Sequence, residues 1–171
     1  LSMLESAVAA LRRGDLPDID QPLDTGTEVK LHVPALIPED YLPDITTRLV
    51  LYKRIAQASN GDQLREIQVE MIDRFGSLPE PVKNLFTGAL IKVRAQQLGI
   101  SEIDMTDEGG SIEFTAATVV EPAAIVNLIQ SDPLCYSLSG SGKLRVQKSL
   151  PTLSSRAEFI DALITPWLET A

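Results

Sequence analysis

The spacing of apolar residues changes along this 171-residue chain, and that change constrains the fold more than any other feature. From residue 44 to residue 98, apolar residues recur every three or four positions, which is the period of an amphipathic helix. After residue 100 the period becomes two, which is typical of half-buried strands. Separate runs of the two periods predict an α+β fold, which we expect to be a small antiparallel sheet packed with about five helices.

Residues 27–61 predict one strand and one helix. "TEVKLHV" at 27–33 alternates apolar and polar residues and predicts a strand. Three prolines between 34 and 43 then predict an irregular connection. Asp44 is placed to cap a helix that runs to about Ser59. The apolar stripe expected to face the core contains Ile45, Leu49, Tyr52 and Ile55 or Ala56.

Two further helices are predicted between residues 62 and 98. The first runs from Asp62 to a left-handed stop at Gly76. Ser77 and Glu80 have the spacing of a capping box for the second helix, which should end near Leu98. The predicted core face of the first helix holds Leu64, Ile67, Met71 and Phe75.

The last third of the chain predicts two hairpins and two helices. The first hairpin turns near Gly109–Gly110 and the second near Gly140–Gly142. A short helix opens at Pro122 between them, and a terminal helix carries Pro166 near its end as a kink or a stop. The expected order is strand, three helices, two strands, helix, two strands, helix.

The charge distribution favours a protein partner over a nucleic acid. The net charge is −9, residues 46–100 carry eight basic and five acidic residues, and residues 101–135 carry seven acidic and no basic ones. Nucleic-acid binding depends on clustered Lys and Arg, which the chain lacks. No run of 18 apolar residues predicts a membrane span. The single Cys135 fits a reducing cytoplasm, where we expect the protein to reside.

Residues that could carry chemistry are few. "SGSGK" at 139–143 lacks the first Gly and the final Ser or Thr of a phosphate-binding loop, so a turn explains its glycines. His32 is the only histidine, and we expect it to be exposed and without a role, since one histidine cannot form a zinc site. The acids Asp104, Asp107 and Glu108 could hold a hard cation, but a solvated turn is the preferred interpretation. We therefore expect no catalytic residue, metal or cofactor in this chain.

The end of the helix that stops at Gly76 carries an unexpected acid. Glu70 and Arg74 have the favourable i, i+4 order, which is worth about 0.2–0.5 kcal/mol on an exposed helix. Asp73 lies near the negative end of the helix dipole, which costs roughly 0.3–1 kcal/mol. Glu70, Asp73 and Arg74 form a compact mixed-charge patch that is suited to bidentate pairing with arginines of another protein.

Three segments closely resemble the C-terminal domain of the bacterial transcription-repair coupling factor: "LIPEDYLPDITTRLVLYKRIA", "EIQVEMIDRFGSLPEPVKNLF" and "RAQQLGI". The resemblance is strong over 36–100 and looser over 101–171, where "GGSIEF" still matches. "LESAVAALRRG" resembles the end of that family's translocase part. Leu4, Val8 and Leu11 have helical spacing before a stop at Gly14, and the acidic segment that follows, with two prolines, predicts a linker at 15–26. The resemblance implies that the helix at 1–14 belongs to the preceding module and that 27–171 is a C-terminal regulatory domain. Because the chain begins with Leu1, we expect it to be a piece of a longer protein.

The resemblance also implies a function. The family's full protein is an ATP-driven double-stranded DNA translocase that displaces stalled RNA polymerase and recruits excision repair. Its C-terminal domain packs on an N-terminal UvrB-like module, hides the surface that recruits UvrA, and restrains the motor. The family's contact residues match Glu70, Asp73 and Arg74, which implies pairing with arginines of that module.

Two other interpretations stay open. One is an enzyme or a small-ligand or metal-binding domain that uses the acidic segment 101–135. The other is a free-standing adaptor for RNA polymerase.

Overall fold

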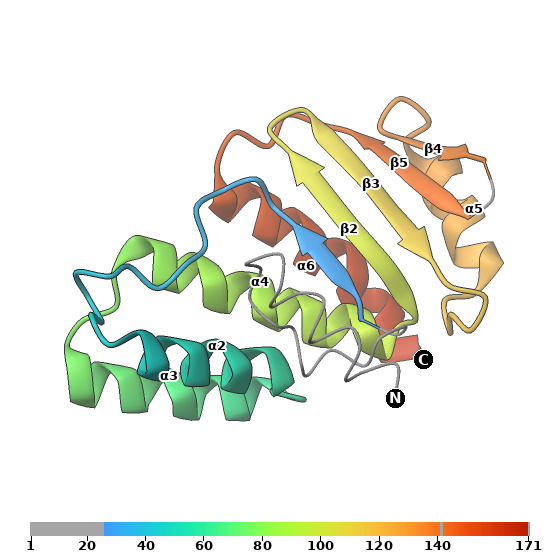
Figure 1. The fold of residues 1–171 in the computed structure, drawn as a ribbon. Coiled ribbons are helices and arrows are strands. Elements are labelled where there is room, and N and C mark those ends of the chain that lie inside the picture. The colour runs from blue at the N-terminus through green and yellow to red at the C-terminus, as the bar shows by residue number, and fades with distance from the viewer. Residues whose placement is uncertain (1–25, 141, 171) are drawn as a thin grey trace, which may run out of the picture.

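The computed structural model describes residues 26–140 and 142–170. The order of elements follows the predicted one (Figure 1). The first four elements are β1 (Glu28–Lys30), α2 (Ile45–Gln57), α3 (Gly61–Phe75) and α4 (Glu80–Gln97). The strand β1 belongs to the sheet, and the three helices form the helical part. The remainder comprises β2 (Ile100–Thr106), β3 (Gly109–Phe114), α5 (Pro122–Ser131), β4 (Tyr136–Ser139), β5 (Lys143–Gln147) and α6 (Leu153–Thr170). Within these residues, no helix combines the length and the apolarity that a membrane crossing needs. The predicted helix at 1–14 and nearly all of the predicted linker at 15–26 lie outside the described residues.

The five strands form one sheet in the order β1-β2-β3-β5-β4. Strands β2, β3, β5 and β4 pair antiparallel, whereas β1 pairs parallel to β2. The long connection from β1 to β2 through three helices allows the parallel arrangement, since a tight hairpin would enforce the antiparallel one. The predicted α+β class is confirmed, and the parallel edge strand is the part that sequence periodicity did not show.

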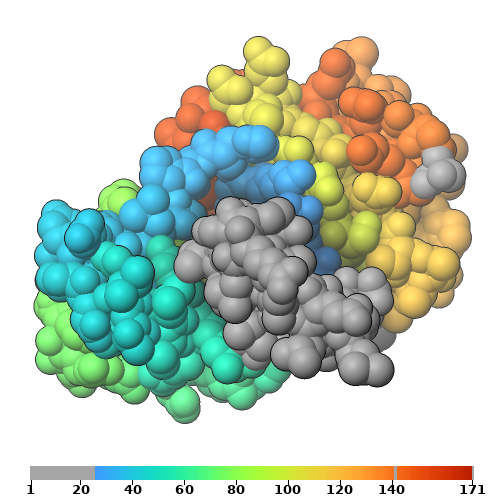
Figure 2. All heavy atoms as spheres, in the orientation of Figure 1, coloured from blue at the N-terminus to red at the C-terminus, as the bar shows by residue number. Residues whose placement is uncertain are grey.

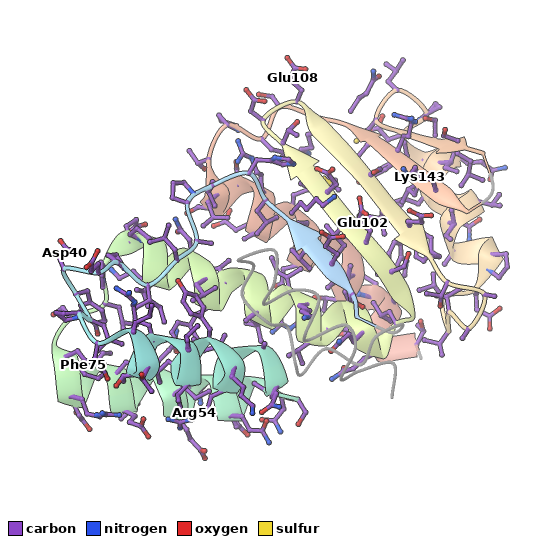
Figure 3. The ribbon with its side chains drawn as sticks, viewed as in Figure 1. Asp40, Arg54, Phe75, Glu102, Glu108 and Lys143 are labelled. Atoms are coloured by element: carbon purple, nitrogen blue, oxygen red, sulfur yellow. The ribbon has the colours of Figure 1, made fainter. Side chains whose placement is uncertain are left out.

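All the described helices that flank the sheet lie behind it in Figure 1, so no described helix covers its other face. Inward-facing residues of β2, such as Ile103 and Met105, are completely buried. The other face is polar, and Figure 3 shows Glu102 and Lys143 on it.

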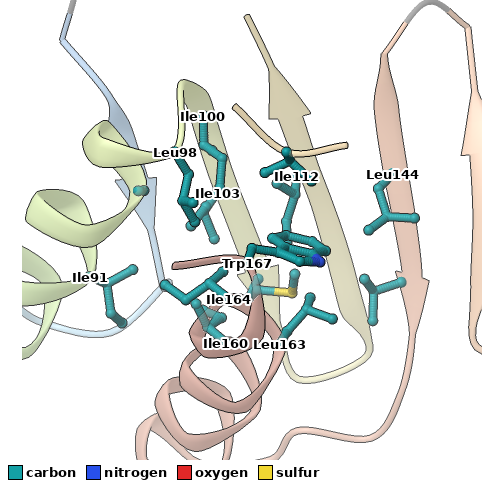
Figure 4. Close-up of a cluster of buried hydrophobic side chains, with 14 of the residues drawn as sticks. Ile91, Leu98, Ile100, Ile103, Ile112, Leu144, Ile160, Leu163, Ile164 and Trp167 are labelled. Atoms are coloured by element: carbon teal, nitrogen blue, oxygen red, sulfur yellow. The ribbon is translucent and has the colours of Figure 1, made fainter. Parts of the chain in front are cut away.

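Two hydrophobic clusters share helix α4. The larger cluster joins the sheet to α6 and the second half of α4, and Figure 4 shows Trp167 among its aliphatic side chains. The smaller cluster joins α2 and α3 to the first half of α4, and its most deeply buried members are Leu51, Met71 and Val82. The helical part and the sheet lie side by side in the space-filling view (Figure 2). Helix α4 therefore holds the two parts in a fixed relation.

The predicted stripe of α2 is half right. Asp44 caps the helix as expected, since its side chain accepts a hydrogen bond from the Thr47 amide at 3.2 Å. Ile55 is buried and Tyr52 packs against the smaller cluster, as predicted. However, Ile45 is 60% exposed and Leu49 is 39% exposed, and Leu51, which was not predicted, is buried. This short helix has apolar residues on several sides, so the stripe depends on where α3 and α4 pack rather than on periodicity alone.

Two features were predicted for the turn between α3 and α4, and one of them is confirmed. Gly76 has a φ of 92° and ends α3, as expected of a glycine terminator. The capping box is wrong, because Pro79 occupies the cap position of α4 and no side chain caps the helix. The helix begins two residues later than a cap at Ser77 would require, so Ser77 lies outside the cap position. At the other end of the chain, Pro166 does not stop α6, which continues to Thr170.

Candidate interaction surface on helix α3

Helix α3 exposes one charged face because its opposite side is buried. Leu64, Ile67 and Met71 are buried against α2 and α4, as their helical spacing predicted. The residues half a turn away must then face solvent. We define the α3 charged face as Glu70, Asp73 and Arg74, the three predicted partner-binding residues.

Glu70 is tied to the neighbouring helix. Arg54 of α2 donates two hydrogen bonds to its carboxylate, from Nη1 to Oε2 at 2.5 Å and from Nη2 to Oε1 at 3.2 Å. This bidentate pair lowers the pKa of Glu70, with the Arg54 hydrogen bond as the main cause. Figure 3 shows Arg54 on α2. Glu70 therefore holds α2 and α3 together and keeps its negative charge at a fixed position.

Arg74 is also held in place. Its Nη1 lies 3.5 Å from Glu70 Oε2, one helical turn back. Its guanidinium carbon lies 4.7 Å from the centre of the Phe75 ring, which is a cation–π distance. The Phe75 ring meets Tyr41 edge to face, and the Tyr41 hydroxyl donates to the Gly76 carbonyl oxygen at 2.9 Å. The end of α3 that carries Arg74 is thus anchored to the loop before α2.

Asp73 differs from its two neighbours. It is exposed and makes no hydrogen bond or ion pair with any residue that the structure describes. It lies in the last turn of α3, where the helix dipole disfavours an acid. Val69 and Ile72 beside it are 53% and 46% exposed. The surface therefore offers one unpaired carboxylate, two fixed charges and an apolar margin.

Arg54, Phe75 and Tyr41 support the charged face, and their roles were not predicted. Lys53-Arg54 stood out in the sequence only as a pair of adjacent basic residues. The i, i+4 rule finds partners within one helix, so it could not find a pair 16 residues apart on two helices. The two helices were predicted as neighbours, so an arginine on one opposite an acid on the other is the pattern that could have predicted the pair of Arg54 and Glu70.

The acidic segment shows no sign of a metal site. Within residues 26–140 and 142–170, no group of three or more His, Cys, Asp or Glu side chains could hold a metal ion. The turn at Asp107 and Glu108 is a structural one, since the carbonyl oxygens of these two residues accept hydrogen bonds from the amides of Leu150 and Lys148. The structure thus gives no support to the metal-binding interpretation of residues 101–135.

His32 is exposed as expected, and it has a hydrogen-bond partner that the sequence did not predict. Its Nε2 lies 2.6 Å from Asp104 Oδ1, on the next strand. The two residues are 72 positions apart, and only the pairing of β1 with β2 brings them together. His32 has a φ of 56°, which ends β1 earlier than the alternation predicted.

A comparison with family models identifies the kind of domain. The model of the TRCF domain matches residues 31–125, which is more than half of the chain and includes the charged face. The chain belongs to the TRCF domain family. Curated relatives agree: this TRCF domain is 41% identical over 160 residues to the transcription-repair-coupling factor of Escherichia coli and 38% identical over 164 residues to that of Haemophilus influenzae. The resemblance stated from the sequence is confirmed.

These relatives are much longer than the chain. The alignments cover 94% and 96% of this chain but only 14% of each relative. A solved structure described as the C-terminal domain of transcription-repair coupling factor shares the fold, with a TM-score of 0.71. That match covers 86% of this chain and 96% of the other at 23% identity. The chain thus spans about one-seventh of the length of these two relatives.

Proposed function

We propose that this TRCF domain is a non-catalytic, autoinhibitory part of a transcription-repair coupling factor. It packs on the N-terminal UvrB-like module of the same protein through Glu70, Asp73 and Arg74. While it is bound there, it masks the surface that recruits UvrA and restrains the ATP-dependent DNA translocase. Its direct partner is the UvrB-like module, and it interacts with UvrA and RNA polymerase only indirectly, through the parent protein. The process is transcription-coupled nucleotide-excision repair in the cytoplasm.

The observation that carries the proposal is the state of the α3 charged face. Glu70 and Arg74 are already held by Arg54 and Phe75, so they lose little freedom when a partner binds. Asp73 is unpaired among the described residues and lies where an acid weakens the helix. A guanidinium of a partner would satisfy that carboxylate.

The chemistry of the face also fits a reversible contact. Exposed charges are screened beyond about 10 Å at 0.1 M salt, so such a clamp should be weak and sensitive to salt. An autoinhibitory contact needs a modest strength, since a ligand can open it only by its own difference in affinity for the two states.

The test is binding of this chain to the separately expressed UvrB-like module of its own parent, at low and at high salt. We expect salt-sensitive binding that Glu70→Ala with Asp73→Ala abolishes. The matched control is Asp107→Ala with Glu108→Ala, which also removes two exposed acids but at the hairpin turn (Glu108 is shown in Figure 3). The control variant should bind like the wild type.

The same double change belongs in the full-length parent, where tethering supplies a high local concentration of the two modules. We expect UvrA binding and ATPase activity both to rise. If both stay repressed in a folded Glu70→Ala and Asp73→Ala parent, the assigned residues are wrong. If polymerase captures the isolated chain without any UvrB-like module, the domain is an adaptor instead.

A further inference from the structure

A hollow of about 610 Å³ lies between α5 and α6, and we call it the α5–α6 hollow. Helix α6 lines it with Phe159, Ala162, Leu163, Pro166, Trp167 and Thr170. Leu163 and Trp167 form a buried floor, but Ala162 and Pro166 are exposed and Phe159 is half-buried, so apolar surface remains for an occupant. Figure 1 places α5 and α3 at opposite ends of the molecule, so the hollow is separate from the α3 charged face.

Both walls of the hollow have the period of a helix face. The lining residues of α6 are spaced i, i+3, i+4, i+7, i+8 and i+11, which is the pattern of an amphipathic helix. They extend from Phe159 to Thr170, or about 16 Å at 1.5 Å per residue. Across the hollow, α5 contributes Ala124, Asn127 and Leu128, at i, i+3 and i+4. Two helix faces on either side of a hollow form the kind of groove in which the apolar side of a third helix packs.

Helix α5 is incompletely packed. Six of its ten residues are Ala, Val, Ile or Leu, yet none of its side chains is fully buried. Leu128 is only partly buried against the larger cluster, and Val126 is 45% exposed. Ala124 on this wall and Ala162 on the opposite wall are small, so they leave room for larger side chains of an occupant. A helix in the hollow would therefore bury apolar surface on both walls.

Among the described lining residues, one carries a charge, and it is basic. Lys148 follows β5, and its Nζ lies 5.3 Å from the centre of the Phe159 ring. The ring attracts the cation but does not neutralise its charge. No acid within the described part of the chain forms an ion pair with Lys148. The hollow therefore suits an occupant that is apolar along its length and acidic at the end near Phe159.

We propose that the α5–α6 hollow binds an amphipathic helix of a partner protein, about three turns long. The apolar ridge of that helix lies on Leu128, Phe159, Ala162 and Pro166, and an acidic side chain near one of its ends pairs with Lys148. This inference does not depend on the α3 charged face. Its failure would leave the proposed clamp untouched.

The experiment uses the whole 171-residue chain and a synthetic helical probe. The probe is a fluorescein-labelled peptide of Ala, Leu, Lys and Glu, which favour a helix. Its leucines are spaced i, i+3, i+4, i+7 and i+8, with one glutamate at each end of this ridge. A second peptide has the same composition, but its leucines are spread around the helix. Fluorescence anisotropy should show saturable binding of the probe and binding of the second peptide that is weaker by about tenfold or more.

Two variants and their matched controls locate the site. Ala162→Arg places a long charged side chain in the hollow, keeps a high helix propensity, and should weaken binding by about tenfold or more. Ala123→Arg makes the same change at an exposed position of α5 that does not line the hollow, so it should bind like the wild type. Lys148→Glu should weaken binding several-fold, and a probe with lysines in place of its two end glutamates should restore it. Lys143→Glu on β5 (Figure 3) should do neither.

Amide chemical shifts give the position of the probe independently. They should change at Asn127 and Thr170, which line the hollow, and stay constant at Glu70 and Asp73. Circular dichroism confirms that each variant is folded.

Four results would overturn the proposal. The first is no saturable binding, or equal binding of the two peptides. The second is equal binding by folded Ala162→Arg and Ala123→Arg. The third is a set of shift changes centred outside the hollow. The fourth is self-association of the chain that Ala162→Arg abolishes, which would show that the occupant is a second copy.

Discussion

Removing Glu70 should weaken the fold by a predictable amount. Glu70→Ala deletes both hydrogen bonds from Arg54 and the longer contact with Arg74. Both partners of the main pair are more than one-third exposed, so the surface range of about 0.2–1 kcal/mol applies, and bidentate geometry favours its upper end. The contact with Arg74 adds about 0.2–0.5 kcal/mol. We expect a loss of about 1–1.5 kcal/mol in the free energy of unfolding, or roughly 2–6 °C in melting temperature.

A double-mutant cycle isolates the pair itself. Urea unfolding of Arg54→Ala, Glu70→Ala and the double variant should give a coupling energy near 1 kcal/mol at pH 7. The same cycle on Arg65 and Asp62 is the control, and its coupling should be close to zero because that pair is long and exposed.

The coupling should also depend on pH with a defined sign. Arg54 lowers the pKa of Glu70 below its usual value of 4.5, so the stabilisation is complete above that value. It should be lost as the pH falls through the lower pKa of the folded state. A coupling energy of zero at pH 7, or one that survives full protonation of the carboxylate, would refute the reasoning.

Three further predictions concern the cores. Met71→Ala should cost about 2–5 kcal/mol because Met71 is completely buried, whereas Ile72→Ala beside it should cost under about 1 kcal/mol; urea unfolding measures both. Arg156→Met should cost about 2–4 kcal/mol, measured in the same way, because buried Arg156 donates to two carbonyl oxygens, one before α6 and one after β1. Burial raises the pKa of Tyr136 to about 12, so ultraviolet titration should show a component that ionises near pH 12 and that Tyr136→Phe removes, with stability falling as the pH rises from about 10 to 12.

Much of the fold could be predicted because periodicity reports which side of each element is buried. The core positions Leu64, Ile67 and Met71 followed from helical spacing alone. The buried side of α2 followed only in part: Ile55 was predicted, but Leu51 was not, since the apolar residues of this helix lie on several sides and packing selects among them. Whether β1 pairs parallel or antiparallel is likewise a property of the long connection rather than of the strand sequence.

The candidate site was only partly visible in the sequence. Adjacent charges on one helix predicted the patch of Glu70, Asp73 and Arg74, because residues four positions apart on a helix are neighbours. The partners that hold two of them come from other elements: Arg54 from α2 and Tyr41, through Phe75, from the preceding loop. Contacts between distant positions depend on tertiary packing, so no local pattern contains them.

Asp73 is the residue at which stability and binding should separate. It is unpaired among the described residues, and in the last turn of α3 its charge opposes the helix dipole. Alanine also has a higher helix propensity than aspartate. Asp73→Ala should therefore stabilise the isolated domain, by about 0.5–1 kcal/mol in urea unfolding.

The same change should weaken binding to the UvrB-like module, because the clamp loses its one unpaired carboxylate. Asp73→Asn is the matched control: it keeps the shape of the side chain, removes the charge and should also weaken binding. If Asp73→Ala instead destabilised the isolated domain, the acid would have a partner within the chain, and its position would no longer be evidence for a clamp.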